Sequence, residues 1–95
     1  MNISSKILSS LLSDGEDVVL VDVRETDEFA QRHIDGALNW PLESLGDHLQ
    51  THSVQTSIVF ICHSGQRSLQ ACSFAKMIGY KDVKSLEGGM SAWPN

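Results

Sequence analysis

The feature of this sequence that most restricts its fold is an apolar run that leads directly into a cysteine, a short turn and a helical pattern. Four apolar residues, mostly β-branched or aromatic, occupy positions 58–61, and Cys62 follows them at once. Gly65 lies in the turn, and residues 68–77 have the pattern of a helix. A buried strand followed by such a turn and helix places the thiol of Cys62 at the carboxyl edge of a sheet. The start of the helix directs backbone N–H groups at the sulfur, which lowers a thiol pKa and holds an anion beside it.

The rest of the chain alternates between strand and helix patterns with short connections. Further strands are expected at residues 18–22, 37–40 and 83–86, and the first is continuously apolar, as in a strand covered on both faces. The first expected helix carries apolar residues from Ile3 to Leu12 and stops at Asp14-Gly15, with Ser4 or Ser5 as its N-cap. Ile3 also fits a short edge strand.

Four more helices are expected after these strands. They are a helix capped by Thr26 or Asp27 and running to Arg32, a helix over Leu42, Leu45 and Leu49 that Gly46 breaks or frays, the helix after Cys62 that Gly79 ends, and a last helix after Glu87-Gly88-Gly89 with Met90 and Trp93. Residues 50–57 are polar and predict a loop. The alternation predicts an α/β fold with a mostly parallel sheet and helices on both faces.

Length and charge narrow the classes of function. The 95 residues make one domain with one core and are too few for two, so we expect a single domain over residues 1–95. The net charge of −5 and the scattered Lys and Arg residues argue against a nucleic-acid surface. The N-terminal segment is too short and too polar for a signal sequence or a membrane span.

The two cysteines, Cys62 and Cys72, do not resemble a disulfide framework. One ends a strand and the other lies well inside the following helix, so a bridge would distort that unit. A reduced, cytoplasmic location is therefore expected. Cys72 is interpreted mainly as a packing residue, with a redox role as the alternative.

Two polar clusters follow expected strands. Asp22 and Arg24 come after the first, and the segment from Cys62 to Arg67 comes after another. If these strands are neighbours, both clusters meet at one edge of the sheet, where α/β proteins bind their ligands.

The segment after Cys62 has the composition of an anion-binding loop with a nucleophile. Backbone N–H groups could form the anion site along His63, Ser64, Gly65, Gln66, Arg67 and Ser68. Gly65 suits a positive φ angle, and Ser68 is placed to donate its hydroxyl to the thiolate. Arg67 could bind the oxyanion of a donor, or it could brace the loop by binding carbonyls or a carboxylate.

Other polar residues have supporting or structural interpretations. Asp22 and Arg24 either support the loop electrostatically or pair with each other and with Glu28. His63 is expected at the rim of the site, where it contributes specificity or positive charge rather than general-base catalysis.

The remaining histidines and the tryptophans are interpreted structurally. His33 is expected to form a hydrogen bond near a turn, and His48 and His52 to be solvated. The four histidines have no metal-ligand spacing with either cysteine. Trp40 and Trp93 are expected to cover the core, with a place for Trp40 at the edge of the site as the alternative.

Four segments together resemble the single-domain rhodanese family of sulfurtransferases. They are Cys62-x4-Arg67-Ser68 after a strand, Asp22-Val23-Arg24 with Glu28-Phe29, the segment His33-Ile34-Asp35-Gly36-Ala37, and the ending Leu86-Glu87-Gly88-Gly89 with Trp93. They occur in the family's order over essentially the whole chain. Arg32 and Asp35 depart from the pattern, where the family usually has Gly and often Pro, and this bears on the substrate or partner rather than on the class.

The resemblance implies a three-layer domain with a five-stranded sheet and a double-displacement reaction. Cys62 would take the outer sulfur of thiosulfate, a persulfide or a polysulfide, and a thiol, cyanide or protein acceptor would then remove it. No metal or organic cofactor is implied, and no nucleic acid or membrane partner is expected. A monomer and a dimer both remain open.

Two other functions remain as alternatives. A cysteine-dependent phosphatase or arsenate reductase also has a Cys-x(n)-Arg loop, but with five intervening residues where this chain has the four from His63 to Gln66. The shorter loop suits a single sulfur atom better than a tetrahedral phosphate. A non-enzymatic persulfide carrier or partner-binding module is the second alternative.

Overall fold

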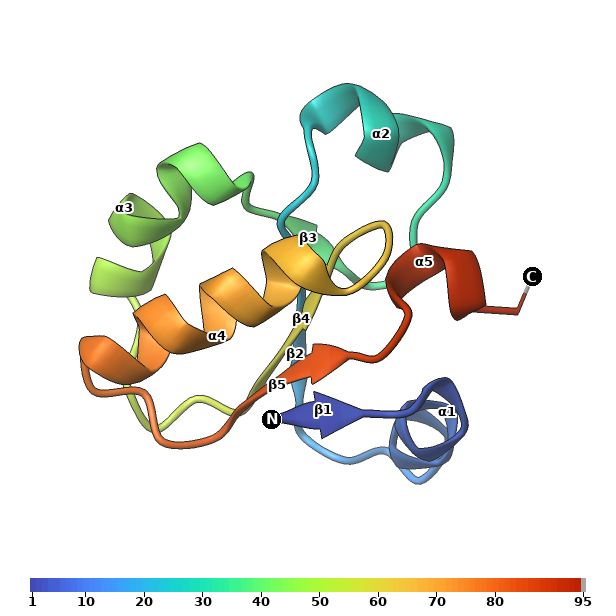
Figure 1. The fold of residues 1–95 in the computed structure, drawn as a ribbon. Helices are drawn as coiled ribbons and strands as arrows, with labels where there is room; N and C mark the ends of the chain where they lie inside the picture. Colours follow the sequence, from blue (N-terminus) through green and yellow to red (C-terminus); the bar gives the residue numbers. More distant parts are fainter. Residues whose placement is uncertain (95) are drawn as a thin grey trace.

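A parallel five-stranded sheet forms the centre of the molecule (Figure 1). The computed structural model describes residues 1–94. Its strands are β1 (Asn2–Ile3), β2 (Val19–Asp22), β3 (Leu38–Asn39), β4 (Ile58–Ile61) and β5 (Val83–Leu86), in the spatial order β1-β5-β4-β2-β3. Every neighbouring pair is parallel. The expected α/β class and five-stranded sheet are confirmed, and β4, whose four residues are all buried, is the central strand.

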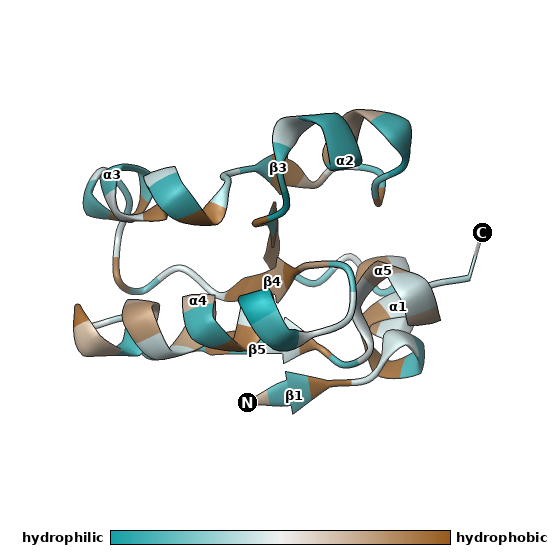
Figure 2. Cartoon of the chain, turned by 45° about the horizontal axis from the view of Figure 1, so that its top comes forward, coloured by the Kyte–Doolittle hydropathy of each residue, from teal (hydrophilic) through white to brown (hydrophobic). Residues whose placement is uncertain are grey.

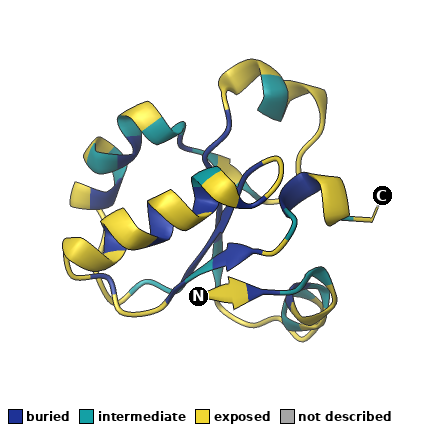
Figure 3. Ribbon diagram, in the orientation of Figure 1, coloured by how far each residue is buried: buried dark blue, intermediate teal, exposed yellow. Residues whose placement is uncertain are grey.

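Helices cover both faces of the sheet. They are α1 (Ser5–Ser13), α2 (Thr26–Gln31), α3 (Leu45–Gln50), α4 (Gln66–Met77) and α5 (Gly89–Ala92), with a 3-10 turn at Leu42–Ser44 before α3. Successive residues of a strand point to opposite faces, so β4 contributes Phe60 to the core under α3 and α4, and Val59 to the core under α1 and α5. The buried stripe of α4 faces the sheet in Figure 3, and the central strand β4 has the brown of hydrophobic residues in Figure 2.

The start of α1 agrees with one of the alternatives from the sequence, whereas the starts of α2 and α4 differ from the predictions. Ile3 lies in the edge strand β1, and Ser4 caps α1 by accepting a hydrogen bond from the Ile7 N–H at 3.1 Å. Glu25, rather than Thr26 or Asp27, caps α2, because its backbone N–H and the Glu28 side chain complete a capping box. The helix α4 begins at Gln66, two residues earlier than expected.

The prediction that Gly46 breaks or frays its helix is also wrong. Gly46 lies within α3, and the irregularity precedes it, where the 3-10 turn meets the helix at Leu45. A Cβ at position 46 would lie 3.4 Å from the ring of Phe74, an ordinary van der Waals contact, so α3 lies directly beside this side chain of α4.

Trp40 lies in the core on the α3 side of the sheet and is 7% exposed. The ring of the half-buried His48 stacks on it at a centroid distance of 4.8 Å, and the exposed His52 lies at the same distance with a tilted ring. The prediction that both histidines are solvated is therefore wrong for His48. No helix within residues 1–94 is long and apolar enough to cross a bilayer.

Candidate active site

The two polar clusters meet at the carboxyl edge of the sheet. The strands β2 and β4 are neighbours, with Asp22 in register with Ile61, and the Val23 N–H donates to the Ile61 carbonyl at 2.9 Å. Asp22 and Cys62 therefore leave adjacent strands at the same edge. The convergence inferred from the sequence depended on this neighbourhood, which the topology provides.

Cys62 lies beneath the loop that joins β4 to α4 and is 1% exposed. The N–H of Gly65 donates to its Sγ at 3.0 Å, and the Ser68 hydroxyl lies 3.3 Å from the same sulfur. Gly65 has a φ angle of +104°, a conformation that favours glycine, and it aims its N–H back at the sulfur while starting α4.

These contacts favour the thiolate of Cys62. Burial alone would raise the pKa of this thiol, but hydrogen bonds from the Ser68 hydroxyl and from the N–H groups of Ser68, Gly65 and Ser64 hold the pKa below its ordinary value. Cys72 is also buried, in the core beneath α4, and without comparable donors burial raises its pKa to about 11. Both cysteines are free.

Ser85 of β5 extends the hydrogen bonding behind the sulfur. Its Oγ lies 2.6 Å from the Ser68 Oγ, and both serines are fully buried. When Ser85 donates to Ser68, the Ser68 proton is free to point at Cys62, so the two hydroxyls form a chain that ends on the sulfur.

The backbone of α5 holds the start of the loop. The N–H of Met90 donates to the Cys62 carbonyl at 2.8 Å, and that of Ser91 to the His63 carbonyl at 3.0 Å. A Cβ on Gly89 would overlap the backbone of Cys62 and His63. Gly89 is therefore required for this close approach.

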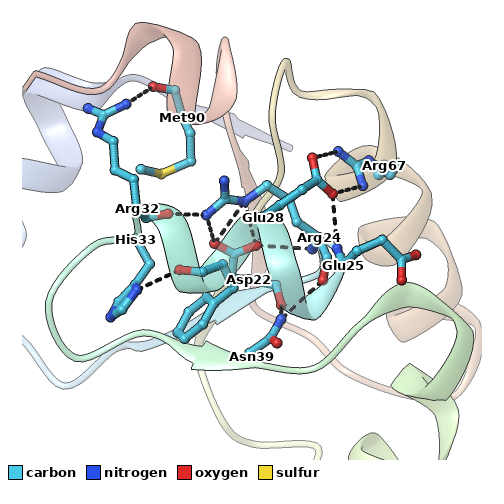
Figure 4. Close-up of polar contacts among 10 residues, drawn as sticks. Asp22, Arg24, Glu25, Glu28, Arg32, His33, Asn39, Arg67 and Met90 are labelled. Carbon is cyan, nitrogen blue, oxygen red and sulfur yellow. Dashed lines mark hydrogen bonds and ion pairs between the residues drawn. The ribbon is translucent and has the colours of Figure 1, made fainter.

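Arg67 is paired with Glu28 of α2, as Figure 4 shows. Both guanidinium terminal nitrogens reach the carboxylate, at 2.9 and 3.2 Å, and this hydrogen bonding lowers the pKa of Glu28 to about 2. Of the roles considered for Arg67, the structure contains the contact with a carboxylate, which ties α2 to the start of α4.

Asp22 and Arg24 form a buried pair. Arg24 donates from Nε and Nη2 to the Asp22 carboxylate, with a shortest distance of 2.8 Å, and Nη2 also donates to the Arg32 carbonyl (Figure 4). Neither side chain hydrogen-bonds to residues 62–68 in the part of the chain that the structure describes. Of the interpretations from the sequence, the pairing of Asp22 with Arg24 is confirmed, but the inclusion of Glu28 in that pair is wrong, because Glu28 binds Arg67 instead.

The remaining loop residues line the surface. His63, Ser64 and Gln66 are exposed, and no hydrogen bond joins the N–H groups of His63, Gln66 or Arg67 to Sγ within residues 1–94. His33 bonds through Nδ1 to the Phe29 carbonyl at 2.8 Å, the structural role expected for it. Among residues 1–94, no group of three or more His, Cys, Asp or Glu side chains could hold a metal ion.

Sequence reasoning missed two contributors to the site, Ser85 and the contact of Glu28 with the loop. Ser85 points to the same face of β5 as the buried Val83. A polar residue on such a buried face indicates a buried hydrogen-bond partner. Glu28 carried no comparable signal, because its partner lies 39 residues away.

Comparison with known proteins gives consistent matches over nearly the whole chain. The rhodanese-like domain family matches residues 4–95. A sulfurtransferase of Allochromatium vinosum is 41% identical over 91 residues, which cover 96% of this chain and 85% of that protein. The thiosulfate sulfurtransferase GlpE of Shewanella oneidensis is 34% identical and covers 86% of this chain and 81% of its own length.

Solved structures agree with these matches. The human single-domain sulfurtransferase TSTD1 superposes with a TM-score of 0.89 at 32% identity, covering 97% of this chain and 93% of that one. A rhodanese-like domain protein from Staphylococcus aureus has a TM-score of 0.91 at 29% identity, covering 99% and 91%.

Proposed function

Because this chain belongs to the rhodanese-like domain family, we propose that it is a sulfurtransferase in which Cys62 carries sulfur from a donor to a thiophilic acceptor. The main support for this proposal is the set of hydrogen-bond donors around the Cys62 sulfur. Cys62 lies at the start of a loop whose N–H and hydroxyl groups lower its pKa. Such a site supplies a thiolate nucleophile and stabilises a persulfide that keeps a negative charge.

The reaction proceeds by two displacements. With thiosulfate as donor, the Cys62 thiolate attacks the outer sulfur, the donor S–S bond breaks, and sulfite leaves with the electron pair. Cyanide or a thiol then attacks the outer sulfur of the persulfide, and the electron pair of that S–S bond returns to Cys62. The Ser85–Ser68 chain and the Gly65 N–H stabilise the Cys62 thiolate, which is the nucleophile of the first displacement and the leaving group of the second.

The donor is proposed to be thiosulfate, a persulfide or a polysulfide. The name of the Shewanella relative supports thiosulfate. The loop of four residues between Cys62 and Arg67 supports a sulfur substrate over a phosphate ester, and the engagement of Arg67 by Glu28 leaves its guanidinium less available to a phosphate.

The first test is an intact-mass measurement of the reduced protein after incubation with thiosulfate. We expect a gain of one sulfur atom that cyanide reverses, an equal gain in Cys72→Ser, and none in Cys62→Ser. Equal loss in both variants would contradict a single nucleophile. Absence of any gain with thiosulfate, polysulfide and a persulfidated protein, together with hydrolysis of a phosphate ester, would replace the proposal by the phosphatase alternative.

A second measurement separates an enzyme from a persulfide carrier. Repeated turnover with thiosulfate and cyanide supports the enzyme. A protein donor that outcompetes thiosulfate in loading Cys62 would favour the carrier.

A further inference from the structure

A surface cavity of about 330 Å³ opens beside the reactive loop. It lies between α2, the start of the loop and α5, and its lining includes Arg24, Glu28, Gln31, Arg32, His63 and Ser91. His63 directly follows the nucleophile, so a ligand in this cavity lies next to the loop that covers the sulfur. The function proposed for Cys62 does not use this cavity.

Arg24 offers an unused donor to the cavity. Its side chain is only 6% exposed, and Nε and Nη2 are occupied by Asp22 and the Arg32 carbonyl. Nη1 makes no hydrogen bond within residues 1–94, and in Figure 4 no dashed line reaches this third nitrogen. A guanidinium held rigidly by a buried carboxylate, with one N–H group left over, is a prepared donor for an oxygen ligand.

Arg32 gives the cavity a net positive charge. Its guanidinium donates to the Met90 carbonyl at 3.1 Å and to the Trp93 carbonyl, but no carboxylate pairs with it within residues 1–94. By contrast, Asp22 balances Arg24, and Glu28 and Arg67 balance each other. An uncompensated cation therefore stands beside the loop of a chain whose net charge is −5.

We propose that this cavity binds the carboxylate of a small thiol that accepts sulfur from Cys62. The inference rests on the proposed function and names the class of acceptor. Arg24 Nη1 and the charge of Arg32 hold the carboxylate, and the Gln31 amide provides a further donor. The size of the cavity suits a ligand with a carbon skeleton, since a single inorganic oxyanion would fill only part of it.

The transfer step balances without any further reagent. The thiol loses its proton and its sulfur attacks the outer sulfur of the Cys62 persulfide. A new S–S bond forms on the acceptor, the bond to Cys62 breaks, and the electron pair remains as the Cys62 thiolate. The proton ends on the acceptor persulfide.

The test compares two acceptors that differ only in charge, 3-mercaptopropionate and its neutral methyl ester. The protein is loaded with thiosulfate, and kcat/KM is measured for each acceptor and corrected for its thiolate fraction. We expect the carboxylate to be preferred. Gln31→Glu should lower the ratio of the two kcat/KM values by about threefold or more, and Gln31→Lys should raise it, because charges in a cleft act on a charged substrate. Added salt should reduce both effects.

Two further variants complete the test. Gln55→Glu makes the same change of charge in the exposed loop before β4, at the amino ends of the strands and away from the cavity. It should leave the ratio of the two kcat/KM values unchanged. Arg32→Gln should lower the same ratio, because it removes the positive charge. If the Arg32→Gln protein does not fold, the response to Gln31→Glu still tests whether the cavity binds a carboxylate.

A ratio that does not respond to either change at Gln31, or that favours the ester in the unmodified protein, would overturn the proposal while transfer to cyanide leaves the sulfurtransferase function intact. Absence of transfer to any acceptor would overturn both.

Discussion

Cys62 and Cys72 are both buried free thiols, yet their surroundings have opposite effects on ionisation. Cys62 receives hydrogen bonds from the loop and from Ser68, whereas Cys72 meets apolar side chains of the core. Burial penalises a thiolate at both positions, but only at Cys62 do donors outweigh that penalty. For these two cysteines, the ionisation of the thiol therefore depends on the hydrogen-bond donors around the sulfur and not on solvent exposure.

Alkylation as a function of pH tests this contrast. In Cys72→Ser we expect Cys62 to react with a midpoint below the ordinary thiol pKa of about 8.5, because the thiolate is the reacting form. In Cys62→Ser we expect the remaining thiol to ionise near pH 11, the pKa to which burial raises Cys72. A Cys62 midpoint at or above the ordinary value would contradict the role given to the loop.

Ser85→Ala tests the hydroxyl chain behind the sulfur. Without Ser85, the Ser68 hydroxyl loses its buried partner, and the alkylation midpoint of Cys62 should rise while kcat/KM for thiosulfate falls several-fold. The cost in stability should be about 1–3 kcal/mol, as for one lost buried hydrogen bond. Ser73→Ala, on the exposed side of α4, is the matched control. An unchanged midpoint would reduce Ser85 to a packing residue.

Among the secondary-structure elements, α5 and α2 hold the loop between β4 and α4 in place from two sides. The N–H groups of α5 bind the carbonyls of Cys62 and His63, and Glu28 of α2 binds Arg67 at the start of α4. The loop itself is short and contains a glycine with positive φ. Its shape is therefore held by neighbours that are distant in the sequence.

Gly89→Ala tests the grip of α5. The added Cβ would overlap the Cys62 and His63 backbone, and φ at this position is +57°. Gly36→Ala is the control, because φ is +86° there but nothing lies within 4 Å of the added atom. We expect Gly36→Ala to cost about 1–2 kcal/mol from backbone strain alone and to keep activity, and Gly89→Ala to cost more and to abolish sulfur transfer. Equal effects of the two changes on denaturant stability and activity would argue against the close approach.

At the scale of the whole molecule, one sheet separates two apolar cores. Leu49 and Trp40 belong to the core under α3 and α4, whereas Leu8 is central to the other and Trp93 packs on it. Because both cores share the residues of β4 and its neighbours, we propose that residues 1–95 act as a single cooperative domain.

Unfolding in urea tests that cooperativity. Leu8→Ala and Leu49→Ala should each destabilise the protein by about 2–5 kcal/mol, the usual cost of such a cavity. Trp40→Phe leaves Trp93 to report one core by fluorescence, and Trp93→Phe leaves Trp40 to report the other. Each leucine variant should shift both reports together, and a shift confined to the nearer tryptophan would show two separable units.

The order of strands and helices, the parallel sheet and the place of Cys62 at a strand end could all be predicted from the sequence. These follow from local information: apolar runs, glycines at turns and the spacing of helical stripes. The four motifs, in their order along the chain, also indicated the rhodanese family. Ends of elements were less predictable, since the cap at Glu25 and the continuity of α3 through Gly46 depend on contacts with other residues.

The side-chain contacts at the carboxyl edge of the sheet could not be predicted without the three-dimensional fold. The neighbourhood of β2 and β4, the pairing of Glu28 with Arg67 and the contact of Ser85 with Ser68 all join segments far apart in the chain. A residue type specifies what a side chain can donate or accept, but not which partner the fold brings within about 3 Å. The chemistry of Cys62 could therefore be anticipated from the sequence, whereas the groups that tune and surround it required the fold.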